Sequence, residues 1–160
     1  METVGLGMCW EDLKVGYKFR TIGRTITEAD LVNFINATGM AETLFIDTDY
    51  AEKYAPQGGR LIPGALAYCI CEGLLVQSTL QRTGLAFLNM EFDVKGPTFV
   101  NDTVHVEVEV LEARATSKDP NRGLVRTRND IVNQKGETVI TYTPLRMAAS
   151  RALRDEHAAR

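Results

Sequence analysis

Residues 63–81, PGALAYCICEGLLVQSTLQ, decide the fold of this chain. Their length and composition predict a helix, and Pro63 suits the approach to a first helical turn. From Ala65 to Val76 the segment is apolar on nearly all sides, which is typical of a helix buried inside a domain rather than one on its surface. Such a helix requires the rest of the chain to cover it.

The chain after this helix alternates between apolar and polar residues, as β-strands do. The alternation runs through residues 87–94 (FLNMEFDV), 103–112 (TVHVEVEVLE), 124–133 (LVRTRNDIVN) and 138–145 (TVITYTPL). Between the last two, Gly136 lies where a hairpin turn needs a glycine. Period-two alternation gives each strand one dry and one wet face, the mark of an antiparallel sheet covered on one side. The residues therefore predict an α+β domain in which an antiparallel β-sheet wraps around one long central helix.

Two further helices are predicted before the central one. Residues 25–39 (TITEADLVNFINATG) carry a capping-box pattern at Thr27 and Asp30 and end in a glycine suited to a C-cap. Residues 47–55 (DTDYAEKYA) predict a short helix with Asp47 as its cap.

Composition indicates one globular domain over residues 1–160, with a core at about 10–147 and a short charged tail at 148–160. Hydrophobic residues make up 44% of the chain and charged residues 24%, which is a water-soluble balance. The net charge of −3 and the lack of a polybasic run argue against nucleic acid or a membrane surface as partner. The longest apolar stretch, 61–76, is too short to span a bilayer.

The cysteines indicate a reduced compartment. The chain has 3 of them, Cys9, Cys69 and Cys71, without CxxC spacing, so neither a disulfide framework nor a metal site is expected. The opening METVGLGMCW lacks the cationic segment of a signal peptide. A cytoplasmic protein is predicted.

Four phrases carry a family resemblance over roughly residues 10–147. They are WEDLKVGYKF (10–19), GRTITEADLVNF (23–34), GGRLIPGAL (58–66) and NDTVHVEVEVLE (101–112). In this order they resemble MaoC-like dehydratases, the family that includes (R)-specific enoyl-CoA hydratases. The resemblance implies a hotdog fold, an acyl-CoA thioester as substrate or ligand, and no cofactor or metal. It also implies a homodimer in which the CoA arm enters at the subunit boundary.

The family's hydratase motif, approximately G-D-x-N-P-L-H-x(5)-A, maps onto residues 39–51, GMAETLFIDTDYA. Three motif positions are kept, at Gly39, Leu44 and Ala51. Met40 stands at the position of the catalytic aspartate, Glu42 at the asparagine and Phe45 at the catalytic histidine. Neither a thioether nor a phenyl ring can exchange the proton that hydration requires. The chain has only 2 histidines, His105 in an alternating strand and His157 in the tail, and neither suits the family's geometry.

The carbonyl-binding half of the family site is expected to remain. In such hydratases, backbone N–H groups at the start of the central helix polarise the thioester carbonyl, and Gly64 and Ala65 begin that helix here. Pro63 replaces the histidine that often precedes the glycine. Arg60, after two glycines near the helix entrance, is a candidate for CoA phosphates or an ordinary surface residue.

Three carboxylates are candidates for the missing proton transfer. Glu42 lies on the motif loop itself, where a solvated acid is the plainer interpretation. Glu72 lies in the dry central helix, where an unpaired carboxylate is costly and has a raised pKa. Its spacing is similar to that of the helix glutamate in hotdog thioesterases, but the plainer interpretation is a structural glutamate at a dimer seam, paired with an arginine or capping backbone groups. Asp47 is the third candidate, beside its expected role as a cap.

These residues leave three functions open. The first is a hydro-lyase on an acyl-CoA that has recruited one of the carboxylates. The second is a thioesterase in which Glu72 activates water. The third is a non-catalytic subunit that binds an acyl thioester beside an active partner. An open sheet edge and an over-apolar helix favour a homodimer in each case.

Overall fold

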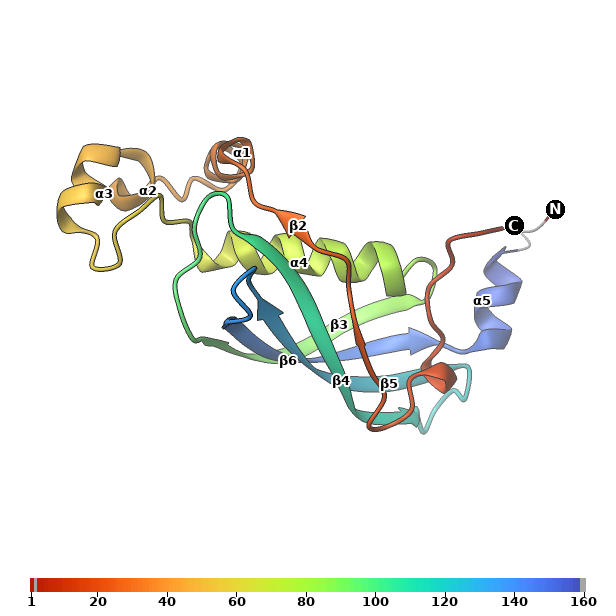
Figure 1. Cartoon of the computed structure of the whole chain (residues 1–160). Helices are drawn as coiled ribbons and strands as arrows, with labels where there is room; N and C mark the ends of the chain where they lie inside the picture. The colour runs from red at the N-terminus through yellow and green to blue at the C-terminus, as the bar shows by residue number, and fades with distance from the viewer. Residues whose placement is uncertain (2, 159–160) are drawn as a thin grey trace.

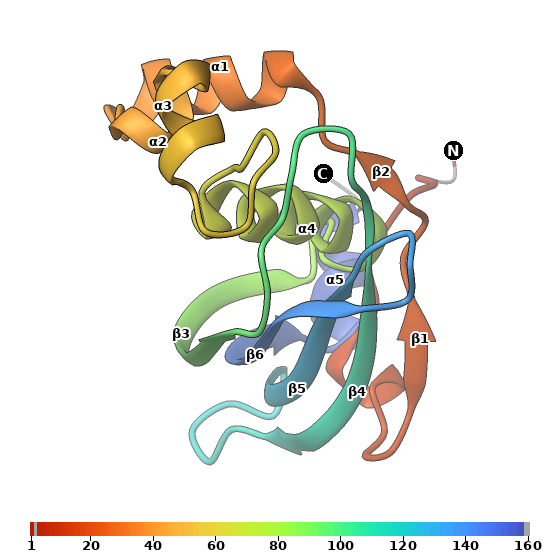
Figure 2. The same ribbon diagram turned by 60° about the vertical axis from the view of Figure 1, so that its left-hand side comes forward.

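The protein consists of an antiparallel sheet that curves around one long helix (Figures 1 and 2). The computed structural model describes residue 1 and residues 3–158, without the side chains of residues 157 and 158. The strands are β1 (Lys18–Arg20), β2 (Arg24–Thr25), β3 (Gly84–Val94), β4 (Thr103–Ala115), β5 (Arg122–Val132) and β6 (Thr138–Ala149). The helices are η1 (Trp10–Asp12), α1 (Glu28–Thr38), α2 (Thr43–Ile46), α3 (Thr48–Tyr54), α4 (Gly64–Thr79) and α5 (Arg151–Ala158).

The central helix and its sheet confirm the predicted α+β architecture. Across the sheet the strands run β1-β4-β5-β6-β3, with β2 paired to β4, and these pairs are antiparallel. One face of α4 is buried at Leu66, Ala67, Ile70, Cys71, Leu74 and Leu75. This face packs against inward residues of the sheet, among them Val104, Val106, Ile131 and Ile140. The valines alternate with exposed or half-buried residues along β4, as the period-two pattern predicted. This arrangement is the hotdog fold.

Strand β3 departs from the predicted pattern. Its residues are exposed on both faces, and large apolar side chains such as Phe87, Leu88 and Met90 are 45%, 46% and 36% exposed. The prediction of one dry face was wrong for this strand because β3 is the edge of the sheet and pairs only with β6 in the described part of the chain. Exposed apolar edge strands favour pairing with another strand.

The two predicted N-terminal helices are confirmed with their caps. The Thr27 hydroxyl accepts a hydrogen bond from Asp30 N, and the Asp30 carboxylate accepts one from Thr27 N, which is the expected capping box. Gly39 ends α1 with a φ of 72°, a left-handed conformation that glycine adopts without strain. Helices α2 and α3 lie beyond α1 and project from the end of the sheet (Figure 1).

The N-terminal segment and the C-terminal tail meet at the opposite end of the molecule. Trp10 lies so close to Gly123 of β5 that a Cβ there would be 2.2 Å from the Trp10 Cγ. The charged tail, predicted without a helix, instead extends β6 to Ala149 and forms α5, and Arg151 Nη2 lies 2.5 Å from Asp12 Oδ1. Within the described ranges, no helix is long and apolar enough to cross a membrane.

Candidate functional site

An open groove of about 450 Å³ lies at the start of α4. It is lined by Phe45 of α2, by Gln57 and residues 61–64 leading into α4, and by residues 94–98 at the end of β3. We call it the helix-start groove. It brings together the motif loop and the helix entrance, which the sequence predicted as two parts of one site.

The start of α4 has backbone N–H groups that precede its helical hydrogen bonds, and Gly64 there lines the groove. Pro63 is the N-cap and has no side-chain hydrogen bond to the helix. The first hydrogen bonds of the helix run from the N–H groups of Leu66 and Ala67 to the Pro63 carbonyl. The N–H groups of Gly64 and Ala65 come before these and have no carbonyl partner within the helix. Such donors, with the positive end of the helix dipole behind them, suit a carbonyl oxygen that gains negative charge.

The two residues that the motif resemblance places at the catalytic positions lie differently in the fold. Phe45 is half-buried and forms part of the groove wall. Met40 is 45% exposed in the turn before α2 and is not among the lining residues. Among the described residues that line the groove there is neither a carboxylate nor an imidazole. The groove can therefore hold a polar group but has no acid–base pair of its own.

The carboxylates of the motif loop act as helix caps. The Glu42 carboxylate accepts a hydrogen bond of 2.7 Å from Leu44 N at the start of α2. The Asp47 carboxylate accepts one of 2.9 Å from Tyr50 N, which confirms the predicted cap of α3. Both side chains are exposed and are engaged with the backbone of their own helices.

Glu72 has the arginine partner that a buried carboxylate requires. Arg146 Nη2 donates to both Glu72 oxygens at 2.7 Å, and the two side chains are only 14% and 15% exposed. The Tyr142 hydroxyl donates to the same carboxylate at 2.6 Å. Burial, and then the charge of Glu72, raise the pKa of the Tyr142 phenol, so it remains a donor. Burial and Glu72 also raise the pKa of the Cys71 thiol to about 12, which keeps it protonated.

Aromatic rings surround this ion pair. The rings of Tyr68 and Tyr142 meet edge to face with centroids 5.1 Å apart, and Phe92 of β3 meets Tyr68 in the same way at 5.6 Å. The Arg146 guanidinium lies over the Phe87 ring at 4.9 Å. Glu72 follows Gly64 by two helical turns, so the cluster lies about 12 Å along the axis from the start of α4.

Sequence reasoning missed Tyr142 and Arg146, although one signal was available. Tyr142, Pro144 and Arg146 are two residues apart along β6 and share one strand face. Tyr142 and Pro144 are fully buried, so an arginine on the same face of the strand requires a buried acid as its partner. Glu72 was the one acid in the central helix that could supply it.

Arg60 is engaged by two other segments. Its Nε and Nη2 donate to the Glu28 carboxylate of α1 at 3.1 and 2.7 Å, and its Nη1 donates to the Phe45 carbonyl at 2.6 Å. The Arg60 hydrogen bonds hold the pKa of Glu28 below its usual range. These hydrogen bonds occupy donors on both sides of the guanidinium. The contact of Arg60 with CoA phosphates stays a prediction.

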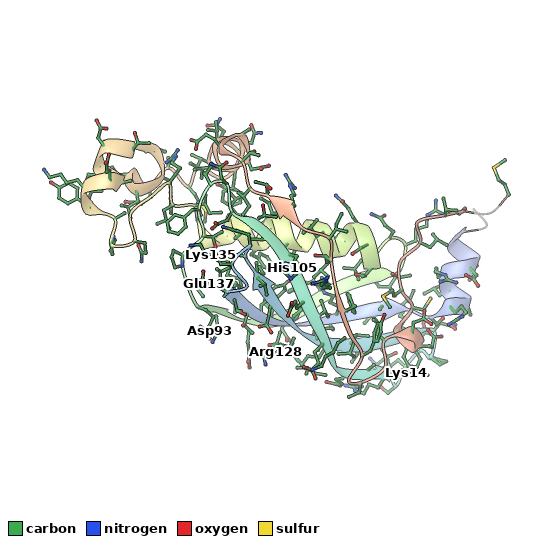
Figure 3. The ribbon with its side chains drawn as sticks, viewed as in Figure 1. Lys14, Asp93, His105, Arg128, Lys135 and Glu137 are labelled. Atoms are coloured by element: carbon green, nitrogen blue, oxygen red, sulfur yellow. The ribbon has the colours of Figure 1, made fainter. Side chains whose placement is uncertain are left out.

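A second hollow adjoins the groove. Its volume is about 420 Å³, and Gln57 and residues 95–97 line both spaces. Lys135 and Glu137 of the β5–β6 hairpin lie on its rim, near Asp93 at the end of β3 (Figure 3). This rim carries both signs of charge.

His105 lies away from the groove. It is on β4 (Figure 3) and its Nε2 is 3.3 Å from Glu107 Oε1, on the strand face opposite the buried Val104 and Val106. The sheet thus separates His105 from α4. The side chain of His157 lies outside the described part of the chain.

Known structures share this fold over nearly the whole chain. A MaoC-like dehydratase from Rhodospirillum rubrum superposes with a TM-score of 0.78 at 28% identity, covering 91% of this chain and 99% of its own. A monoamine oxidase regulatory protein from Archaeoglobus fulgidus gives a TM-score of 0.79 at 26% identity, covering 90% and 95%. An R-hydratase from Pseudomonas aeruginosa gives 0.72 at 25% identity, covering 91% and 88%.

A double-hotdog protein from Mycobacterium tuberculosis has the same fold at 22% identity, with a TM-score of 0.78 over 93% of this chain and 46% of its own. No curated protein matches the sequence. The family model described as FAS1-like, dehydratase domain region, matches residues 14–142. The chain therefore belongs to this dehydratase family and shares its hotdog fold with the MaoC-like dehydratases.

Proposed function

We propose that this protein binds an acyl-CoA thioester in the helix-start groove and leaves proton transfer to a partner subunit or domain that carries an aspartate–histidine pair. The observation that carries the proposal is the composition of the groove. Backbone donors at Gly64 and Ala65 suit a thioester carbonyl, whereas the described lining residues include neither a carboxylate nor an imidazole to take a proton from water. The adjoining hollow offers room for the polar arm of CoA.

Hydration of an enoyl thioester needs a base for water and an acid for the α-carbon. Phe45 supplies neither, and Glu42 and Asp47 cap helices. The protein thus belongs to a dehydratase family. The chemistry of its own groove suits the binding of a thioester without proton transfer.

The thioesterase alternative has less support. It needs a carboxylate within about one water molecule of the thioester carbonyl. Both oxygens of Glu72 accept hydrogen bonds from Arg146, and one also accepts from Tyr142. The carboxylate also lies about 12 Å along α4 from the proposed carbonyl site.

One set of measurements separates the three functions. The purified protein is titrated with butyryl-CoA by calorimetry and then incubated with crotonyl-CoA while enoyl absorbance and free thiol are followed. We expect binding with neither a loss of enoyl absorbance nor a release of free thiol. Enoyl loss by the protein alone would establish an independent hydro-lyase, and thiol release a thioesterase. An absence of any binding would overturn the proposal.

A graded pair of variants tests where the ligand lies. A Cβ at Gly64 would have Val94 Cγ2 as its nearest neighbour at 3.8 Å, which is ordinary contact. Gly64→Ala is therefore expected to keep affinity for butyryl-CoA. Gly64→Leu places a branched side chain in the groove and is expected to raise the dissociation constant more than about tenfold. Equal affinities for both variants, with circular dichroism unchanged, would place the ligand elsewhere.

The apolar edge at β3 supports a dimer, which we propose as the form of the isolated protein. Leu88→Lys places a charge on this edge and is expected to shift the protein toward the monomer in light scattering at micromolar concentration. Leu111 on β4 is similarly exposed, at 43% against 46% for Leu88, so Leu111→Lys is the matched control. A mass unchanged by Leu88→Lys, or changed equally by both, contradicts this interface.

A further inference from the structure

Arg60 joins three segments that are distant in sequence. Its guanidinium bridges α1 and α2 through Glu28 and the Phe45 carbonyl, which are 32 and 15 residues away from it. The Arg60 side chain is 23% exposed and that of Glu28 53% exposed. The contact therefore lies at the surface, where isolated ion pairs contribute little to stability. Its hydrogen bond to Phe45, a residue that lines the groove, gives it a different significance.

We propose that Arg60 is a positioning residue that holds Phe45 and helix α2 against the helix-start groove, so that ligand affinity depends on this contact. The inference rests on the proposed thioester binding at the same groove. Phe45 has two roles in the geometry: its ring lines the groove, and its carbonyl accepts the Arg60 hydrogen bond of 2.6 Å. A displacement of Arg60 therefore moves the groove wall.

The chemistry of the contact requires an arginine. Phe45 lies in the four-residue helix α2, whose last carbonyls have no further helical turn to donate to them. A cationic donor satisfies such a carbonyl. The Nε–Nη2 edge of the same guanidinium forms a fork on Glu28, while Nη1 reaches Phe45. The rigid fork fixes the angle between the two partners, which a flexible lysine cannot do.

The surrounding backbone fixes Arg60 itself. Gly58 and Gly59 have φ values of 64° and 71°, which non-glycine residues adopt rarely. A Cβ at Gly59 would be 3.2 Å from the Phe99 ring, so the turn also packs closely there. The Arg60 carbonyl accepts a hydrogen bond of 2.9 Å from Val100 N. The arginine thus reaches α1 and α2 from a fixed base.

Hydrogen exchange tests the clamp without any ligand. In Arg60→Ala we expect backbone amides of residues 43–54 to exchange at least about threefold faster than in the wild-type protein, while those of α4 are unchanged. Glu28→Gln keeps the shape of the side chain but loses its charge, and is expected to give a smaller increase. Arg24 forms a comparable pair with Asp30 on α1 at 2.6 Å, so Arg24→Ala is the matched control and should leave residues 43–54 unchanged. Unchanged exchange in Arg60→Ala would overturn the proposal.

A double-mutant cycle tests whether Arg60 acts through Phe45. Arg60→Ala is expected to weaken butyryl-CoA binding about tenfold, and Arg60→Lys to recover only part of this loss. In a Phe45→Ala background the same Arg60→Ala change is expected to alter affinity less than about twofold. An equal loss in both backgrounds would show that Arg60 contacts the ligand directly and would overturn the positioning role. If the wild-type protein binds no acyl-CoA, the proposed function fails, while the exchange experiment still decides on the clamp.

Discussion

Met40→Asp combined with Phe45→His is expected to give this protein enoyl-CoA hydratase activity at least about 100-fold above its own background. General acid–base catalysis contributes about 10²–10⁴-fold when the groups are placed at the reacting atoms. Phe45 already lines the groove, so a histidine at this position carries its imidazole to the wall beside the start of α4. An aspartate at position 40 supplies the acid that the family's motif places on the same loop.

The measurement is the loss of crotonyl-CoA absorbance by the double variant under saturating substrate. Ile46 is the next residue of α2, is 55% exposed and is not among the groove residues, so Met40→Asp with Ile46→His is the matched control. We expect the control to remain at background. Equal rates in the two double variants, with butyryl-CoA still bound, would show that the β-carbon does not lie beside position 45.

The second large effect is on stability. Arg146→Met is expected to lower the free energy of unfolding by about 3–5 kcal/mol, because it leaves the buried Glu72 carboxylate without its cation. The Tyr142 hydroxyl would be its remaining donor among the contacts described above. Urea denaturation followed by circular dichroism measures the loss, with the m-value as a check on two-state behaviour.

A compensating change distinguishes a lost charge pair from lost packing. Glu72→Gln in the Arg146→Met background removes the unpaired charge but keeps an oxygen that accepts from Tyr142. We expect the double variant to recover most of the lost stability, because replacing both members of a buried pair costs far less than removing one. A double variant as unstable as Arg146→Met would mean that the arginine acts through its contact with Phe87 instead.

Much of the fold followed from local patterns. The central helix was predicted over residues 63–81 and found at Gly64–Thr79. The four predicted strands were found, and each is longer than predicted. The ends of a strand depend on its pairing with neighbouring strands, which local sequence does not show. The caps at Thr27 and Asp47 were also predicted, since each side chain bonds to the backbone only three residues away. Strands β1 and β2, with 3 and 2 residues, are too short for a periodic pattern, and neither they nor helix α5 were predicted.

The candidate site was predicted in part. The meeting of the motif loop with the helix entrance followed from the family resemblance, and Phe45 and Gly64 line one groove. Met40 is not part of that lining, which the motif alone does not reveal. Arg60 was placed near the helix entrance, but its partners on α1 and α2 are set by how those helices pack.

The sequence by itself determined the central helix, the four long strands, their order and the caps at Thr27 and Asp47. These features depend on residues within one helical turn or one strand, where spacing in sequence is spacing in space. Only the tertiary structure decided that β3 lies at an exposed edge, that Glu72 pairs with Arg146 across 74 residues, and that Arg60 bridges Glu28 and the Phe45 carbonyl. These contacts depend on strand order and on the curvature of the sheet around α4, which bring distant residues together and leave no periodic trace in the chain.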